Sequence, residues 1–261
     1  MVLTVNQKVQ EVLLEAASAY RNAGLTRCLR ARHRWYLRWI PWVKAMSTSG
    51  TPKRSPALQA GRQPAYHEHA RSYDRDTGVF WPYRRAVVDA LLLRPGQVVL
   101  DVGCGTGLCC GLLRDKVGPD GTVIGIEESP QMAAVAREYI AREGWRNVIV
   151  VQAPAEDARL QETADAALFC AVHDILQSPR ALRNVMAALC PGAWVAAGGG
   201  KWATPPMTAV NSAVRMLHAP YVRDVSGFGR PWRYLERLVQ DVRVREMAFG
   251  GGYVMTGRTP A

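Results

Sequence analysis

Residues 98–107, which read VVLDVGCGTG, join an apolar run to a turn built on alternating glycines. Such a run predicts a strand that ends where the glycines begin. Gly103, Gly105 and Gly107 let the backbone turn sharply and approach a ligand closely, because only glycine takes positive φ without a side-chain penalty. The stretch therefore predicts a strand that leads into a ligand-binding turn, and it favours a nucleotide-like ligand.

The spacing of these glycines differs from that of a dinucleotide-binding turn, G-x-G-x-x-G, because Leu108 stands where the third glycine would follow. Asp101 precedes the first glycine. Its carboxylate would repel a pyrophosphate but attract a cationic amino-acid group such as that of S-adenosylmethionine. Residues 99–107, VLDVGCGTG, resemble the glycine-rich motif of class I S-adenosylmethionine-dependent methyltransferases.

The net charge of +11 is concentrated near the N-terminus. Residues 1–65 contribute +9 and the other 196 residues only +2. A strongly basic protein is often a binder of nucleic acid or of an anionic membrane surface. Since the part with the glycine motif is nearly neutral, we expect no nucleic-acid partner for it.

Two regions are expected along the chain. Residues 1–65 predict a basic, poorly ordered N-terminal extension and linker, although the arginine- and tryptophan-rich residues 27–44 would also suit RNA, a membrane surface or targeting. Met46 opens a polar stretch typical of the start of a cytosolic chain, and we expect it to be the natural start. Residues 66–261 predict the methyltransferase domain, with a substrate-shaping insert at about 202–232.

The six cysteines form no C-x-x-C pair, which indicates reduced intracellular thiols. No apolar run approaches the roughly 20 residues that span a bilayer. We therefore expect a cytoplasmic protein without a transmembrane segment, and a homodimer is compatible with the sequence. We expect no metal site.

Strands and helices are expected to alternate after residue 80. The predicted strands are 98–102, 122–127, 147–152, 164–171 and 193–199, and the predicted helices include 81–93, 108–116, 130–144, 207–217 and 231–239. The pairs Ser129-Pro130 and Ser178-Pro179 each predict the start of a helix, the second of which is expected to end near residues 191–192. Residues 242–249 and 253–258 predict an antiparallel hairpin across three glycines. The pattern predicts an α/β fold with a doubly wound, mostly parallel sheet. Ending in a hairpin, it resembles the seven-stranded, Rossmann-like class I methyltransferase architecture.

The resemblance implies S-adenosylmethionine as the cofactor and a set of residues that bind it. Asp101 would hold the amino group, the loop would run along the methionine portion, and Glu127 would accept hydrogen bonds from the ribose hydroxyls. Pro154 departs from the family pattern, in which many relatives have an acid near adenine. The implied cofactor-binding residues are Tyr73, Asp101, Gly103, Cys104, Gly105, Thr106, Gly107, Glu127, Glu128, Ala155, Glu156 and Cys170.

Residues 168–174, LFCAVHD, take the place that the family puts beside the transferred methyl group. They lack the Asn or Asp, two prolines and aromatic residue that accompany methylation of exocyclic base amines. Cys170 is expected to be a buried strand residue rather than a nucleophile. His173 is a candidate general base or a histidine bonded to local backbone, and Asp174 would orient it or cap the turn.

Aromatic residues outside the cofactor half predict the acceptor site, namely Trp81, Trp202, Tyr221, Phe228 and Trp232. Such a set suits a flat or apolar small molecule. We therefore expect methylation of a small aromatic or apolar acceptor, at oxygen. Two alternatives stay open: an RNA or protein methyltransferase that docks through the basic N-terminal segment, and a non-catalytic S-adenosylmethionine-binding regulator.

Overall fold

The computed structural model describes residue 74 and residues 77–160, 163–222 and 224–261. Tyr73, Met46 and the extension predicted over 1–65 lie outside the described residues. The chain divides into two units, which we describe separately. The larger comprises Gln63–Trp202 and Ala219–Ala261, whereas Ala203–His218 belong to the smaller one.

The larger unit is built on a seven-stranded sheet with the strand order β3-β2-β1-β4-β5-β7-β6. The first five strands are parallel, and β7 runs antiparallel to both β5 and β6. This confirms the predicted fold class. The strands are β1 (Val98–Val102), β2 (Thr122–Glu127), β3 (Val148–Gln152), β4 (Ala164–Cys170), β5 (Leu189–Gly200), β6 (Gln240–Met247) and β7 (Gly252–Arg258).

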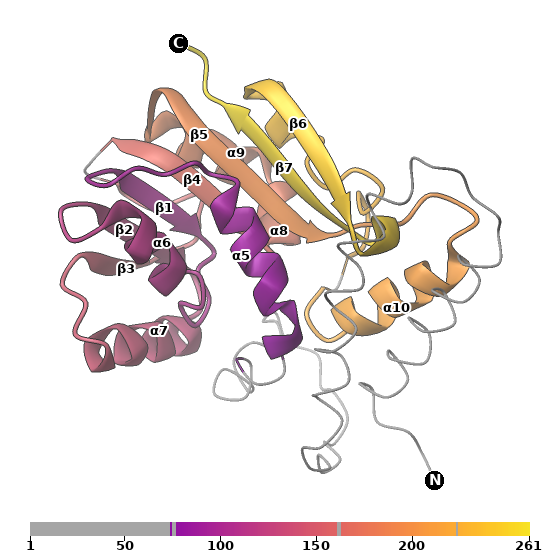
Figure 1. Ribbon diagram of the computed structural model, residues 1–261, viewed down its shortest axis with the longest axis horizontal. Helices are drawn as coiled ribbons and strands as arrows, with labels where there is room; N and C mark the ends of the chain where they lie inside the picture. The colour runs from indigo at the N-terminus through magenta and orange to yellow at the C-terminus, as the bar shows by residue number, and fades with distance from the viewer. Residues whose placement is uncertain (1–73, 75–76, 161–162, 223) are drawn as a thin grey trace, which may run out of the picture. The chain divides into compact units, whose positions relative to one another are not determined.

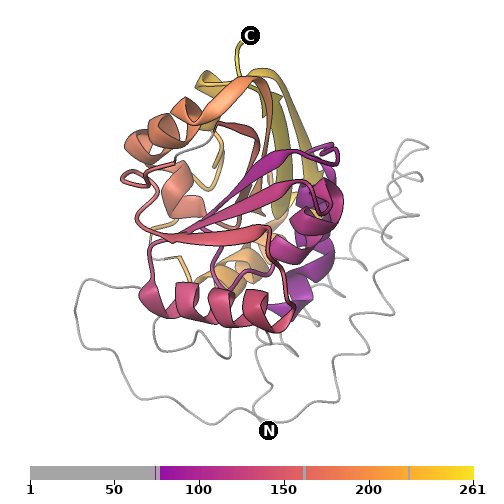
Figure 2. The same cartoon turned by 90° about the vertical axis from the view of Figure 1, so that its left-hand side faces the viewer.

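Helices cover both faces of this sheet (Figures 1 and 2). Short 3-10 turns, η2 (Gly78–Phe80) and η4 (Ala248–Gly250), precede α5 and β7. One face packs against α5 (Trp81–Asp89), α6 (Cys110–Val117) and α7 (Pro130–Arg142), and the other against α8 (His173–Leu176), α9 (Pro179–Ala187) and the 3-10 turn η3 (Leu235–Arg237). In the described part of the chain, no helix combines the length and apolarity needed to cross a membrane.

Two helices begin with the same serine-proline signal. Ser129 Oγ accepts a hydrogen bond from the Met132 amide at 3.3 Å, and Ser178 Oγ accepts one from the Ala181 amide at 3.2 Å. Each serine caps a helix whose first residue is proline, which has no amide hydrogen to leave unpaired. Both predicted helix starts are thereby confirmed.

Three segments differ from the sequence prediction. Residues 231–239 form successive turns around η3 instead of a helix, and the amides of Arg233, Arg237 and Leu238 bond to the carbonyl three residues back. β5 begins at Leu189, before the predicted start, and includes an irregularity in its pairing with β4. The short helix α8 was not expected, and it follows Ala171, whose φ of 61° turns the chain sharply at the end of β4.

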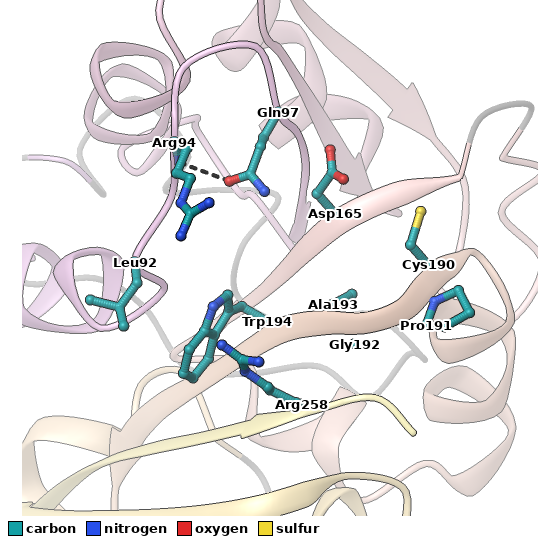
Figure 3. Close-up of a pocket in the computed structure, with 10 residues that line it drawn as sticks. All are labelled: Leu92, Arg94, Gln97, Asp165, Cys190, Pro191, Gly192, Ala193, Trp194 and Arg258. Carbon is teal, nitrogen blue, oxygen red and sulfur yellow. Dashed lines mark hydrogen bonds between the residues drawn. The ribbon is translucent and has the colours of Figure 1, made fainter. Parts of the chain in front are cut away.

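A cavity of about 310 Å³ opens at the amino ends of β1 and β4 (Figure 3). Its lining includes Arg94, Asp165, Trp194 and Arg258, and the Arg258 guanidinium lies 4.2 Å from the centroid of the Trp194 ring. None of the predicted cofactor or acceptor residues lines it. The glycine loop follows the carboxyl end of β1, whereas this cavity lies at the amino ends of the strands, on the opposite side of the sheet from the loop.

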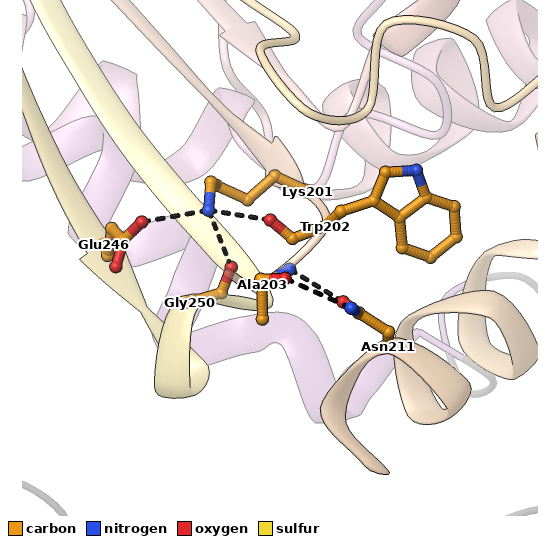
Figure 4. Close-up of polar contacts among 6 residues, drawn as sticks. All are labelled: Lys201, Trp202, Ala203, Asn211, Glu246 and Gly250. Carbon is orange, nitrogen blue, oxygen red and sulfur yellow. Dashed lines mark hydrogen bonds and ion pairs between the residues drawn. The ribbon is translucent and has the colours of Figure 1, made fainter. Parts of the chain in front are cut away.

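A buried lysine fixes the junction between β5 and the hairpin (Figure 4). Lys201 Nζ donates to Glu246 Oε1 at 2.9 Å and to the carbonyl oxygens of Trp202 and Gly250 at 2.8 and 3.0 Å. All three ammonium hydrogens can therefore be satisfied, which compensates the burial of the charge.

In the smaller unit, the Asn211 side chain of α10 (Thr208–His218) bonds both the amide and the carbonyl of Ala203, at 2.7 and 3.1 Å. Helix α10 lies close to the predicted range of 207–217 and ends one residue later. The side chain thus closes the turn that precedes this helix.

Candidate cofactor and acceptor site

The glycine loop between β1 and α6 depends on left-handed backbone at all three glycines. The φ angles of Gly103, Gly105 and Gly107 are 70°, 58° and 85°. The Gly103 amide donates to the carbonyl of Ile126 in β2 at 2.8 Å, which ties the loop to the neighbouring strand. A β-carbon on Gly103 would lie 2.5 Å from Val172 Cγ1, so the loop is pressed against the segment that follows β4.

Glu127, at the end of β2, organises the loop through both carboxylate oxygens. Oε2 accepts a hydrogen bond from the Gly105 amide at 2.9 Å, and Oε1 accepts one from the Ser129 amide at 2.8 Å. A carboxylate offers about four acceptor positions, so each oxygen can still accept one more bond. The adjacent Glu128 side chain is exposed, as expected. The side chain of Glu127 is thus held in place and keeps acceptor positions to spare.

Asp101 lies beneath the loop, and its side chain is buried. Its Oδ2 accepts a weak hydrogen bond from the Cys110 thiol at 3.8 Å. Burial, together with the charge of Glu127, raises the pKa of Asp101 to about 7, and burial is also the main cause that raises the pKa of Glu127. Glu128 and Asp174 raise the pKa of Glu127 further. Four carboxylates therefore act at this loop, and their combined field suits a cation and disfavours a pyrophosphate.

The raised pKa of Asp101 makes stability depend on pH. The folded protein keeps a proton on Asp101 that the unfolded chain, with an ordinary pKa of 3.8, has released below pH 7. The free energy of unfolding should therefore fall as pH rises from about 4 to about 7, by up to about 1.4 kcal/mol per pH unit. Denaturant titrations of the ligand-free wild type and Asp101→Asn should show a steeper fall in the wild type, because only the share of Glu127, whose pKa is also raised, remains in the variant. Parallel pH curves would contradict the prediction.

The segment predicted to line adenine is anchored by helix α9. Sequence reasoning predicted the helix but missed this contact. Asn184 Nδ2 donates to the carbonyl oxygens of Ala155 and Ala158 at 2.9 and 3.0 Å. Arg180, one helical turn earlier, pairs with Asp157. Glu156, between these anchors, is partly exposed. The spacing of Arg180 and Asn184 on one helix face is a sequence signal, but nothing in the sequence shows which loop they meet.

The remaining loop residues are held by contacts within the protein. Cys104 is buried, and its Sγ would lie 2.7 Å from a β-carbon on Gly125, so its side chain packs on β2. Thr106 Oγ1 donates to Asp74 Oδ1, a contact that sequence reasoning missed. Cys170, which is partly buried, interacts with the thiol of Cys109. These contacts hold the loop in position against the rest of the protein.

His173 begins α8 directly after the left-handed residue that ends β4. One ring nitrogen, Nε2, lies 2.8 Å from the carbonyl oxygen of Ser226. A carbonyl can only accept, so we assign the proton to Nε2, which leaves Nδ1 as the acceptor. Nδ1 is buried and has no hydrogen-bond partner in the described part of the chain. Burial lowers the pKa of His173, so the ring is neutral at pH 7. Asp174, beside it, is exposed.

The structure brings three of the ring side chains together. The His173 ring meets the Phe228 ring edge-on, with centroids 4.4 Å apart. The Trp202 ring also contacts Phe228, with centroids 5.3 Å apart. Phe228 is 1% exposed, and Trp232, which packs 4.6 Å from Tyr253, is 8% exposed. The side chains of Phe228 and Trp232 are therefore buried, whereas Trp202 is partly exposed.

Two other predicted acceptor residues keep part of their surface exposed. Trp81, the first residue of α5, is 37% exposed, and Tyr221 is partly exposed. Their part in acceptor binding stays a prediction.

The fold and the loop define a Rossmann-like domain that binds a nucleoside-containing ligand at the carboxyl ends of its parallel strands. The residues present fit S-adenosylmethionine, because a glycine turn without side chains, a carboxylate with free acceptor positions and a negative field match its methionine, ribose and sulfonium parts. Residues 99–192 match the family model described as Methyltransferase domain. These residues thus form a methyltransferase domain.

Known proteins match parts of the chain. Aklanonic acid methyltransferase of Streptomyces sp. strain C5 is 38% identical over 94 residues, which are 35% of this chain and 42% of that protein. Demethylmenaquinone methyltransferase of Symbiobacterium thermophilum is 30% identical over 131 residues, or 47% of this chain and 52% of that protein. The chain thus spans about half, or less, of the length of these relatives. Other matches are named as protein and RNA methyltransferases.

A solved structure supports the fold over most of the chain. The crystal structure of an S-adenosylmethionine-dependent methyltransferase from Aquifex aeolicus superposes with a TM-score of 0.53 at 20% identity. The superposition covers 74% of this chain and 97% of that one. The shared architecture therefore extends beyond the 94 residues that match the family model to the C-terminal strands.

Proposed function

We propose that this protein transfers the methyl group of S-adenosylmethionine to an oxygen of a small aromatic or apolar molecule. The observation that carries the donor half of the proposal is the Glu127 carboxylate, which holds the glycine loop and Ser129 while keeping acceptor capacity for a diol. The acceptor half is supported by the aromatic cluster of Trp202 and Phe228 beside His173. The two relatives named for aklanonic acid and demethylmenaquinone also favour a small-molecule acceptor.

In this mechanism, the cofactor supplies an electrophilic methyl group on a sulfonium, and the chain supplies position and proton transfer. Asp101 and Glu127 fix the two ends of the donor. Binding an ammonium group next to Asp101 favours its ionised form. His173 Nδ1, which is buried in this structure, would accept the hydroxyl proton of the acceptor once acceptor binding uncovers it, while its Nε2 hydrogen stays on the Ser226 carbonyl. Asp174 adds negative charge that stabilises the imidazolium.

The proposed base predicts a specific change in the pH dependence of turnover. Because burial lowers the pKa of His173 below 6.5, the wild-type rate should fall only as pH drops through the region below 6.5. In His173→Asn, kcat at pH 7.5 should drop by about 100-fold and the acidic limb should disappear. Steady-state kinetics across pH 5 to 9 measure both effects.

Gln177→Ala is the matched control for this experiment. Gln177 Nε2 donates to the carbonyl oxygen of Pro231 at 2.9 Å, so this residue also ties the end of α8 to the following loop, but it does not titrate. We expect Gln177→Ala to keep the acidic limb. A His173→Asn variant that also keeps it would show that His173 acts by position and not as a base.

The function itself is tested by binding and turnover in the full chain. Isothermal titration with S-adenosylmethionine should show saturable binding, and mass spectrometry should detect a methylated product from a panel of phenols and hydroxyquinones. Binding without turnover on any acceptor would favour the regulatory alternative. Deletion of residues 1–45 should leave small-molecule turnover unchanged. Loss of RNA or protein methylation in the same deletion would favour docking through the basic segment instead.

A further inference from the structure

The cavity at the amino ends of β1 and β4 takes no part in the proposed function (Figure 3). One of its walls comes from residues 190–193 of β5, which form an irregular bulge where the pairing of β4 with β5 shifts register. Thr259 holds this wall, because its Oγ1 accepts a hydrogen bond from the Ala193 amide at 2.8 Å and donates one to the Cys190 carbonyl at 2.7 Å. The wall is therefore fixed by contacts within the protein.

Two guanidinium groups from distant parts of the chain line this cavity, those of Arg94 and Arg258. Figure 3 shows both side chains extending toward the Trp194 ring. In the part of the chain that the structure describes, neither guanidinium forms an ion pair with a carboxylate. The acidic side chain of the lining, Asp165, accepts a hydrogen bond from the Val98 amide at 2.8 Å instead. The lining thus carries an excess of positive charge.

The hydrogen-bond donors of the lining are held in place by contacts that do not use them. The Arg258 guanidinium lies over the Trp194 ring, 4.2 Å from its centroid, and a contact of this kind consumes none of the guanidinium N–H donors as hydrogen bonds. Gln97 Oε1 accepts a hydrogen bond from the Arg94 amide at 2.7 Å, which leaves the Nε2 group of the same side chain as a further donor. The lining therefore presents several positioned donors.

We propose that this cavity binds the oxyanion group of a small organic acid, a carboxylate or a phosphate ester. A guanidinium suits both groups, because two of its N–H donors can bond two oxygens in parallel. Leu92, Pro191 and Trp194 supply apolar surface for the body of the ligand. The volume of about 310 Å³ is at the lower end of the range for small-molecule sites, about 300 to 1,000 Å³, so the ligand is small. The site is separate from the glycine loop and does not depend on the proposed function.

The test uses benzoate as the probe and benzamide as its neutral counterpart of the same shape. The indole N–H signal of Trp194 reports binding in nitrogen–proton correlation spectra of the full chain, and its absence in Trp194→Phe assigns it. At low ionic strength, benzoate should shift this signal saturably, and benzamide should bind at least about 10-fold more weakly. Added salt should weaken the binding of benzoate only. Inorganic phosphate is titrated in parallel: tighter binding than benzoate assigns the site to phosphate esters, and weaker binding assigns it to carboxylates.

Arg94→Gln and Arg258→Gln should each weaken benzoate binding by about 3- to 10-fold, as expected for a charged donor that is open to solvent, and leave benzamide unchanged. Both arginines are exposed, so we expect the variants to fold, and thermal melts check this. Arg258 contacts the reporting ring, so Arg94→Gln is the variant that leaves this ring contact intact. Arg243→Gln is the control, because it removes the same charge from an exposed residue of β6 outside the lining. It should leave benzoate binding unchanged.

Three results would overturn the proposal. The first is a Trp194 signal that shifts with neither benzoate nor phosphate. The second is equal binding of benzoate and benzamide, which would mean that the cavity offers apolar contact and no anion recognition. The third is an equal loss of benzoate binding in Arg243→Gln and in the two cavity variants, which would show a response to net charge. None of these outcomes bears on the binding of S-adenosylmethionine, so the two proposals fail independently.

Discussion

The Glu127→Gln variant should bind S-adenosylhomocysteine about 100-fold more weakly than wild type. The carboxylate accepts hydrogen bonds from the Gly105 and Ser129 amides through separate oxygens. Glutamine offers one oxygen and a donating amide, so one backbone hydrogen loses its acceptor and one ribose hydroxyl loses a charged partner. Two bonds to a charged group, at about 1.5 kcal/mol each, correspond to this loss.

Glu128→Gln serves as the control, since it removes the same charge from the adjacent exposed residue. Its effect on the affinity should stay within about 3-fold, as expected for an exposed charge. Isothermal titration at one fixed pH and salt concentration gives both dissociation constants. Equal losses in the two variants would mean that Glu127 contributes only its charge, and this would contradict the proposed diol contact.

The Gly103→Ala variant should lose about 2 to 5 kcal/mol in the free energy of unfolding. The new β-carbon would lie 2.5 Å from Val172 Cγ1 and 2.9 Å from Ile175 Cδ1, and the residue would have to keep a φ of +70°. Left-handed backbone costs an alanine about 1 to 2 kcal/mol, and overpacking adds about 1 to 3 kcal/mol. Denaturant titration with circular dichroism measures the sum.

Two other glycines separate the backbone cost from the packing cost. Gly96 has a φ of +85° and open space around a new β-carbon, so Gly96→Ala should lose only the backbone share. Gly105, with a φ of +58°, is equally open. Gly105→Ala should match Gly96→Ala in stability but bind S-adenosylhomocysteine more weakly, because its methyl group enters the cofactor loop. A Gly103→Ala protein as stable as Gly96→Ala would contradict the packing argument.

The sequence predicts the parts of this fold that local signals control. The apolar run before Gly103 predicts β1, and the pairs Ser129-Pro130 and Ser178-Pro179 predict the starts of α7 and α9. The glycine-rich turn predicts the hairpin of β6 and β7. In each case the residues within a few positions of the boundary decide the structure, so no distant contact is needed to find it.

Contacts between distant segments decide what the sequence does not predict. Apolar residues at Trp232, Leu235 and Val239 have helical spacing, yet the segment buries them through 3-10 turns. Asn184 has ordinary helix surroundings in the sequence, and only the packing of α9 brings it to the loop that it contacts. Its role depends on partners 26 and 29 residues away.

The hydrogen bond between His173 and Ser226 connects two parts of the chain that follow each other in sequence. The part that handles the donor lies within residues 99–192, whereas Trp202, Phe228 and Trp232 follow it. On the proposed function, replacement of the later residues would change the acceptor without disturbing the donor loop. His173 belongs to the first part and contacts the second through the Ser226 carbonyl and the Phe228 ring. The carbonyl is backbone, so it does not depend on the side chain at position 226. Exchange of this downstream segment is therefore the expected route by which such a protein would take a new acceptor.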